Sequence, residues 1–199
     1  MSNPLRQVRA TFSEQTIRVY QAYSPEIAMG AVRAQTFVAP FKRERMTWIK
    51  PSFTWMMYRS GWATKPGQER ILGIDILRQG FEWALSHSSA SHFDATTHST
   101  PDEWQTLLRA SPVRIQWDPE RTLKLEVLPW RTIQVGLGGD AVAAYLDNWI
   151  ERIEDVTPLA NRVGALVSAG NVEPAADLVP KELPYPLPRQ IARQIYCTE

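Results

Sequence analysis

Positively charged and aromatic residues are interleaved in one stretch of the chain, residues 41–70. This stretch holds seven Lys or Arg residues and only two acids, whereas the whole chain of 199 residues has a formal net charge of +1. Lys and Arg bind phosphate groups, and flat aromatic side chains stack on nucleobases. The pattern therefore predicts a surface for a phosphate-bearing ligand such as a nucleotide, NAD or a nucleic acid. The competing interpretation places the aromatic residues in the core and the cations in solvent.

Several residues in and near this stretch are candidates for contact with the ligand. Lys50, Arg59 and Lys65 would hold phosphates, and Trp48 or Trp62 would stack on a base. No cofactor is fixed by the sequence, because the stretch contains neither a Walker motif nor a GxGxxG motif; NAD is a candidate. The full set of predicted ligand-binding residues is Tyr20, Trp48, Lys50, Ser52, Arg59, Ser60, Trp62, Lys65 and Gln68.

Two residues are candidates for acid–base chemistry. Glu69 directly precedes the aliphatic segment 70–77, a predicted central strand, and polar side chains at such a position are often functional. The alternative for Glu69 is an ordinary polar turn. His92 is the second candidate, because the nearby Asp94 could orient its imidazole.

The three histidines of the chain lie close together in a segment rich in Ser and Thr. The spacing of His87, His92 and His98 matches no compact zinc signature, so a solvated loop is the favoured interpretation and no metal site is predicted. Asp118-Pro119 is read as a turn. Cys197, the single cysteine, has no neighbouring histidine that would make it a nucleophile.

Hydrophobic periodicity predicts one α+β domain with a mixed, mainly antiparallel sheet of five to six strands and four to five helices. The predicted strands include 17–23, 46–50 and 70–77, and a hairpin of 113–117 with 123–128 is followed by strand 131–137. The predicted helices include 24–35, 140–153 and 157–169, and residues 86–101 are read as a loop.

The two ends of the chain differ in composition from its middle. Residues 1–15 are expected to be a leader, residues 16–173 the domain, and residues 174–199 a Pro-rich tail that lies extended over the surface. A single cysteine fits a reducing compartment, no signal peptide is recognised, and no apolar run approaches the roughly 20 residues that span a bilayer. A cytoplasmic protein without membrane contact is therefore expected.

Three segments of the chain resemble a known family. RMTWIKPSFTWMMYRSGWATKPGQER (residues 45–70), VYQAYS (19–24) and SPVRIQWDPER (111–121) resemble the family of a domain of unknown function numbered 4291, over about residues 6–190. That resemblance implies kinship and no activity.

A second resemblance is one of layout, to ADP-ribosyltransferases. In these proteins a strand with a polar or aromatic residue precedes a helix, and a glutamate stands beside a later central strand. Arg18 or Tyr20, the helix 24–35, Ser52 or Ser60, and Glu69 fit that plan. This resemblance implies NAD as the cofactor and ADP-ribosyl transfer as the reaction.

Functions from other classes stay open at the level of sequence. The cationic surface would also suit a non-catalytic module that binds nucleic acid or protein. The Pro-rich segment 184–188 would suit a scaffold that docks on a partner.

Overall fold

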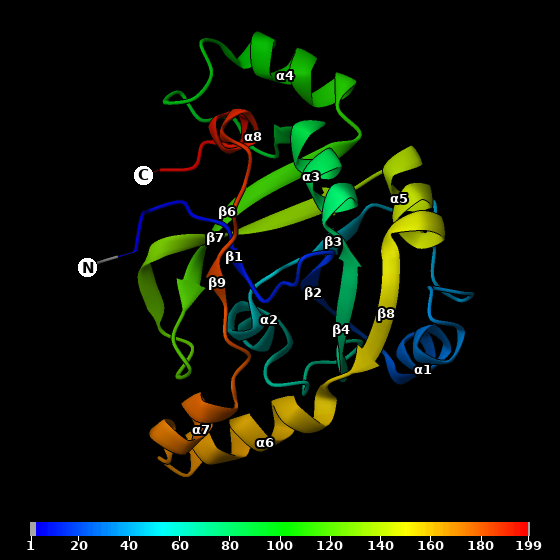
Figure 1. Ribbon diagram of the computed structural model, residues 1–199, viewed down its shortest axis with the longest axis vertical. Helices are drawn as coiled ribbons and strands as arrows, with labels where there is room; N and C mark the ends of the chain where they lie inside the picture. The colour runs from blue at the N-terminus through cyan, green and yellow to red at the C-terminus, as the bar shows by residue number, and fades with distance from the viewer. Residues whose placement is uncertain (1–2, 199) are drawn as a thin grey trace.

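Two sheets carry the α+β fold in the computed structural model, which describes residues 3–198 (Figure 1). The first sheet is antiparallel, with the strand order β2 (Thr16–Tyr23), β4 (Arg70–Leu77) and β8 (Ile150–Asp155). The second has the order β3 (Thr47–Ile49), β7 (Val127–Leu137), β6 (Val113–Arg121) and β5 (Ser88–Ala90), and only β5 with β6 is parallel. The mixed, mainly antiparallel α+β fold is confirmed, but its strands are divided between these two sheets and a short two-stranded one.

β4 is the central strand of the first sheet, as its aliphatic sequence predicts. Its residues 71, 72, 74 and 76 are fully buried, on both faces of the strand. Such a continuous apolar run is typical of a strand covered on both sides. A backbone bridge between Tyr20 of β2 and Lys50, just after β3, joins the two sheets, with N···O distances of 2.7 and 3.3 Å.

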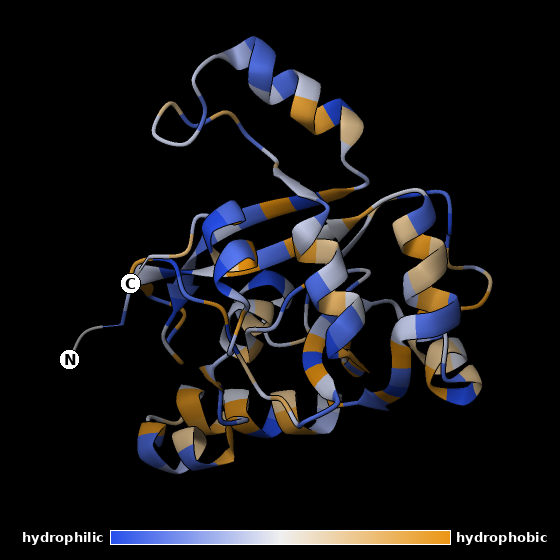
Figure 2. Ribbon diagram, turned by 45° about the horizontal axis from the view of Figure 1, so that its top comes forward, coloured by the Kyte–Doolittle hydropathy of each residue, from blue (hydrophilic) through white to orange (hydrophobic). Residues whose placement is uncertain are grey.

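Helices cover both sheets (Figure 1). α1 (Pro25–Ala34) begins after Ser24 with a proline in its first turn, and α2 (Phe53–Ser60) is capped by Ser52, whose Oγ accepts from Trp55 N. Figure 2 shows α4 (Pro101–Ala110) projecting from the body of the molecule, and none of its residues is buried. The others are α3 (Arg78–Ser86), α5 (Asp140–Ala144), α6 (Thr157–Ser168), α7 (Val172–Leu178) and α8 (Arg189–Gln194).

The two ends of the chain pair with each other. β1 (Arg9–Ala10) and β9 (Leu183–Pro184) form a short antiparallel sheet, and Val8 and Ala10 belong to the main core. Tyr185 packs its ring edge-on against Phe12 and Phe81. Both ends are therefore integrated into the fold, and the prediction of an extended tail was wrong where α7 and α8 form. Residues 1, 2 and 199 of these segments lie outside the described residues.

Three element predictions need correction. β6 runs through Asp118-Pro119, where the register shifts, and the chain turns only at residues 122–126. The predicted strand 123–128 is therefore mostly turn, and the predicted strand 131–137 is the second part of the longer β7. Helix 140–153 ends early: α5 continues into a π-helical turn, η1 (Tyr145–Trp149), and then into β8. The predicted loop 86–101 contains β5.

Pairing between distant segments explains the early end of helix 140–153. Ile153 pairs with Ile74 in the β4–β8 ladder, so an apolar residue assigned to a helix face is buried by a strand instead. Within residues 3–198, no helix has the length and apolar character needed to cross a membrane.

Candidate ligand-binding cleft

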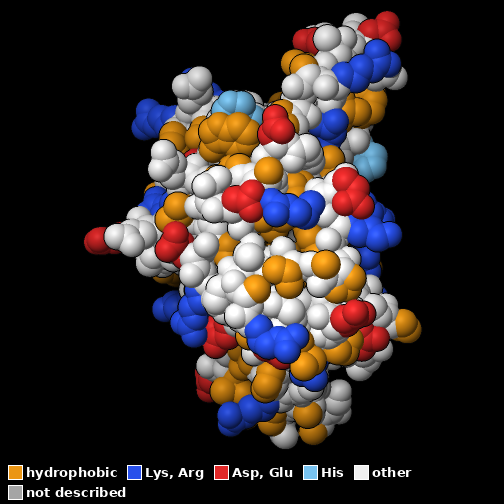
Figure 3. Space-filling view, turned by 90° about the vertical axis from the view of Figure 1, so that its right-hand side faces the viewer, with side chains coloured by type: hydrophobic (Ala, Val, Ile, Leu, Met, Phe, Trp, Pro, Cys, Tyr) orange, Lys and Arg blue, Asp and Glu red, His pale blue; other side chains and the backbone are white. Residues whose placement is uncertain are grey.

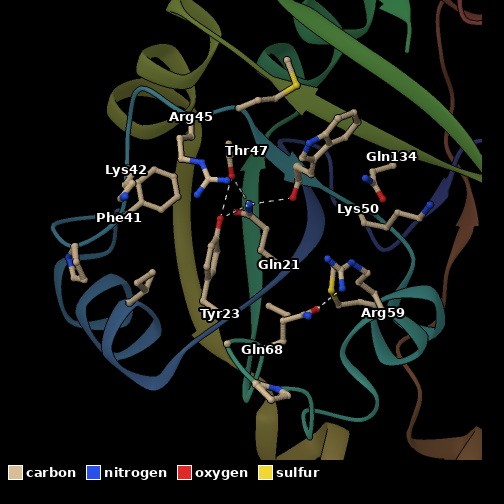
Figure 4. A pocket seen from close by; sticks show the side chains of 18 of the residues that line it. Gln21, Tyr23, Phe41, Lys42, Arg45, Thr47, Lys50, Arg59, Gln68 and Gln134 are labelled. Carbon is tan, nitrogen blue, oxygen red and sulfur yellow. Dashed lines mark hydrogen bonds between the residues drawn. The ribbon is translucent and has the colours of Figure 1, made fainter. Parts of the chain in front are cut away.

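A cleft of about 670 Å³ opens beside the bridge that joins the two sheets (Figure 4). Tyr20 and Lys50 form the one backbone bridge described between the segments of β2 and β3, and these two strands form two walls of the cleft. α1 and α2, the loop before β3, the turn before β4 and one residue of β7 contribute the rest. The cleft is therefore assembled from segments that are far apart in the sequence.

Four cations line this cleft: Lys42, Arg45, Lys50 and Arg59. Arg59 donates from Nη1 to Gln68 Oε1 at 3.1 Å, a contact with a neutral amide that leaves its charge uncompensated. The side chains of Lys42 and Arg45 form no ion pair or hydrogen bond with any residue of 3–198. No Asp, Glu or His is among the described residues of the lining, so the cleft is electropositive.

Lys50 differs from the other three because its ammonium group is fully occupied. Its Nζ lies 2.8 Å from Asp118 Oδ2, 3.2 Å from Thr132 O and 3.9 Å from the ring centroid of Trp55. Burial lowers the pKa of Lys50 to about 8, although the Asp118 carboxylate opposes the shift. Lys50 therefore links β3 to β6 and α2, and only its side-chain stem is free to face a ligand.

A hydrogen-bonded network forms the floor of the cleft. Tyr145 donates from its hydroxyl to Gln21 Oε1 at 2.8 Å. Gln21 Nε2 lies 2.7 Å from Thr47 Oγ1 and 3.0 Å from both Trp48 O and Tyr23 Oη. Burial raises the pKa of Tyr23 to about 12, so its hydroxyl keeps its proton at neutral pH.

The structure brings four of the predicted ligand-binding residues together in this cleft: Trp48, Lys50, Arg59 and Gln68. Sequence reasoning did not select Gln21, Tyr23, Thr47 or Gln134, and it counted Lys42 and Arg45 only toward the local charge. One signal was present for Gln21, a polar residue in the otherwise apolar centre of a predicted strand.

The other predicted ligand-binding residues have structural contacts outside the cleft. Tyr20 is buried and packs edge-on against Phe53, and the Ser52 hydroxyl, besides capping α2, donates to Glu120 Oε1 at 3.0 Å. Ser60 is buried and donates to Met57 O.

Lys65 and Trp62 also point elsewhere. Lys65 Nζ donates to the last carbonyls of α2, those of residues 58 and 59, which is a favourable position for a cation at a helix C-terminus. The indole of Trp62 packs against Gly164 of α6.

The two acid–base candidates do not meet. Glu69 Oε1 accepts from Gly67 N at 2.9 Å within its own turn, and Glu69 is not part of the cleft lining. His92 lies in a second cavity of about 500 Å³, which Asp94 also lines, and its Nδ1 is 2.8 Å from Ser91 Oγ.

The histidines are also separate from one another. His87 stacks on Trp83 with ring centroids 4.1 Å apart, whereas His98 is buried with its Nε2 3.2 Å from Tyr196 Oη. The part of the chain that the structure describes contains no group of three metal-ligating side chains.

The fold and the cleft define an α+β protein with an electropositive cavity between two sheets. Residues 7–185 match the family described as Domain of unknown function (DUF4291), and the chain belongs to that family. No curated protein was found to match the sequence. The family match does not connect the chain with ADP-ribosyltransferases.

Proposed function

We propose that the cleft binds a small phosphate-bearing ligand, with a nucleotide or NAD as the candidates. The observation that carries this proposal is the convergence of Lys42, Arg45 and Arg59 on one cavity whose described lining has no carboxylate. Charges of one sign in a partly enclosed cavity attract an anion more strongly than the same charges on an open surface. A volume of about 670 Å³ lies in the range typical of small-molecule sites.

Binding without catalysis is the form of this proposal that the lining favours. Proton transfer needs a titratable group within reach of the ligand. The described lining has no Glu, Asp or His, the ammonium group of Lys50 is engaged by Asp118, and burial raises the pKa of Tyr23 to about 12. ADP-ribosyl transfer from NAD is the catalytic form, and it would require Glu69 to leave its contact with Gly67. Single-stranded nucleic acid is a second class of ligand, and the calorimetry described next includes it.

Replacing Arg45 by Ala is expected to weaken ligand binding by about 10–100-fold, because a charge-assisted hydrogen bond to phosphate is lost. Isothermal titration calorimetry with NAD, ATP and a short RNA would measure this. Arg43→Ala is the matched control. It removes the same charge two positions away, but the Arg43 side chain binds the exposed Asp147 at 2.7 Å and does not line the cleft. The proposal would be contradicted if the folded protein bound none of the three ligands, or if both variants lost the same amount of ligand affinity.

Replacing Glu69 by Gln is expected to leave ligand affinity unchanged. The Gln side chain keeps an oxygen that can accept from Gly67 N, and position 69 does not line the cleft. Calorimetry and an assay of NAD consumption on the same samples would check this. A variant that still binds NAD but has lost turnover would identify an enzyme and overturn the non-catalytic form.

A further inference from the structure

Trp48 lies flat against the sheet at Gly136, its partner in the β3–β7 ladder. A Cβ atom at position 136 would lie 2.9 Å from three atoms of the indole ring, closer than real Cβ contacts allow. Glycine therefore lets the ring rest directly on the strand. No other aromatic ring in residues 3–198 packs against this indole, and Trp48 lines the cleft. Because Gly136 occupies one face of the ring, the opposite face is the one on which a flat ligand in the cleft would stack.

Tyr23 and Thr47 supply a hydrogen-bond donor that the protein does not use. Their hydroxyl oxygens are 3.0 Å apart, so only one of the two hydroxyl hydrogens can lie in the bond they share. Gln21 Nε2, the other neighbour of both oxygens, cannot accept the second hydrogen, because it is a donor whose orientation the carbonyl of Trp48 fixes. Within the described residues no other acceptor reaches either hydroxyl. One hydroxyl hydrogen is therefore left for a ligand.

The donors are arranged at two ends of the cleft. Figure 4 shows Lys42 and Arg45 on the same side as Tyr23 and Thr47, with Arg59 across the cavity. At the end of the cleft that Lys42 and Arg45 form, these two uncompensated cations and one free hydroxyl hydrogen face the ligand. Phosphate oxygens only accept hydrogen bonds at neutral pH, so this set of donors fits a phosphate group of multiple negative charge.

We infer that the cleft takes a free nucleoside di- or triphosphate, with its phosphates at the Lys42–Arg45 end and its base stacked on Trp48. This inference rests on the proposed function and adds the orientation and the class of the ligand. Gly136 is a specificity-determining residue in this arrangement, because it sets the height of the platform.

A free nucleotide fits the protein better than a nucleic-acid strand does. A strand is held by cations that follow its backbone beyond one pocket. On the face that α1, α5 and β8 present, Lys and Arg side chains are interspersed with Asp and Glu, without a continuous basic track (Figure 3). Three cations that form no ion pair within residues 3–198, Lys42, Arg45 and Arg59, instead share the lining of one cavity.

Calorimetry with ADP, pyrophosphate and a ten-nucleotide RNA tests the inference on the full chain. ADP is expected to bind about 10–100-fold more tightly than pyrophosphate, because the base adds stacking. Gly136→Ala is expected to reduce ADP affinity to nearly that of pyrophosphate and to leave pyrophosphate affinity unchanged. Trp48→Ala removes the platform without adding atoms and is expected to do the same, and Trp48→Phe is expected to be intermediate. Thermal unfolding of each variant verifies folding.

The outcomes separate this inference from the proposed function. Equal affinities for ADP and pyrophosphate, or variants that weaken both ligands equally, would refute the base platform while phosphate binding stands. Tighter binding of the RNA than of ADP would assign the cleft to nucleic acid and overturn the inference. Absence of binding of both small ligands to the folded wild-type protein would refute the inference and the proposed function together.

Discussion

Replacing Lys50 by Met is expected to lower the free energy of unfolding by about 3–5 kcal/mol, because Asp118 would lose the cation that compensates its buried charge. The side chains of Lys50 and Asp118 are only 1% and 11% exposed, and the bond between them is 2.8 Å long. Met keeps the length of the side chain and its packing against Trp55, so the lost charge accounts for most of the effect. Urea unfolding at neutral pH, followed by far-UV circular dichroism, measures this difference.

A second substitution distinguishes the buried charge from a simple packing defect. Combining Lys50→Met with Asp118→Asn is expected to recover most of the loss, because neither member of the former ion pair then carries a charge, and the Asn oxygen still accepts from Gln116 Nε2. Arg43→Ala is a surface control: its partner Asp147 is half exposed, and such pairs contribute at most about 1 kcal/mol. A single variant that unfolds like this control, or a double variant no more stable than the single one, would contradict the argument.

Local patterns in the sequence predicted the elements whose cause is local. Ser24-Pro25 marks the start of α1, and the aliphatic run of residues 70–77 coincides with β4. In both, the residues that decide the conformation lie within a few positions of one another. Of these two elements, α1 also provides part of the wall of the cleft, through Ile27.

Long-range pairing defeated the local patterns elsewhere. The sequence of residues 140–153 has an apolar face at helical spacing, yet β4 pairs with its last part as β8. Asp118-Pro119 has the composition of a turn, but Asp118 is held within β6 by Lys50, which is distant in the sequence. Neither partner is visible in a window of neighbouring residues.

The same dependence on distant partners explains why only some of the predicted ligand-binding residues line the cleft. Residues 41–70 supply most of the lining of the cleft and all four of its cations. Which cations face the cavity depends on where each finds a partner. Lys50 is occupied by Asp118 and Lys65 by the end of α2, whereas Lys42 and Arg45 have no such partner among residues 3–198. Charge alone could not rank them.

Glu182 makes the stability of the fold dependent on pH. Its Oε1 accepts from Phe53 N at 2.7 Å, so it ties the C-terminal segment to the first turn of α2. Burial raises the pKa of Glu182 to about 8. The Phe53 N–H, Arg9 and Lys50 act in the opposite direction, while the carboxylate of Glu120 adds to the rise. The residue as a whole is partly exposed, but its carboxyl group is enclosed and holds its proton at neutral pH.

Replacing Glu182 by Gln is therefore expected to flatten the pH dependence of stability between about pH 5 and 7.5. The unfolded chain releases this proton above its ordinary pKa of 4.5, while the folded protein keeps it until about pH 8. The stabilising contribution is thus complete below pH 4.5 and falls by about 1.4 kcal/mol per pH unit as the pH rises toward 8. Gln stays neutral and keeps an acceptor for Phe53 N, so the variant should match the wild type near pH 5 and exceed it near pH 7.5. Urea unfolding of both proteins between about pH 5 and 7.5 measures this, and the range stops below the pKa of Lys50. If the stability of the two proteins changed in parallel with pH, Glu182 would be ionised in the folded protein.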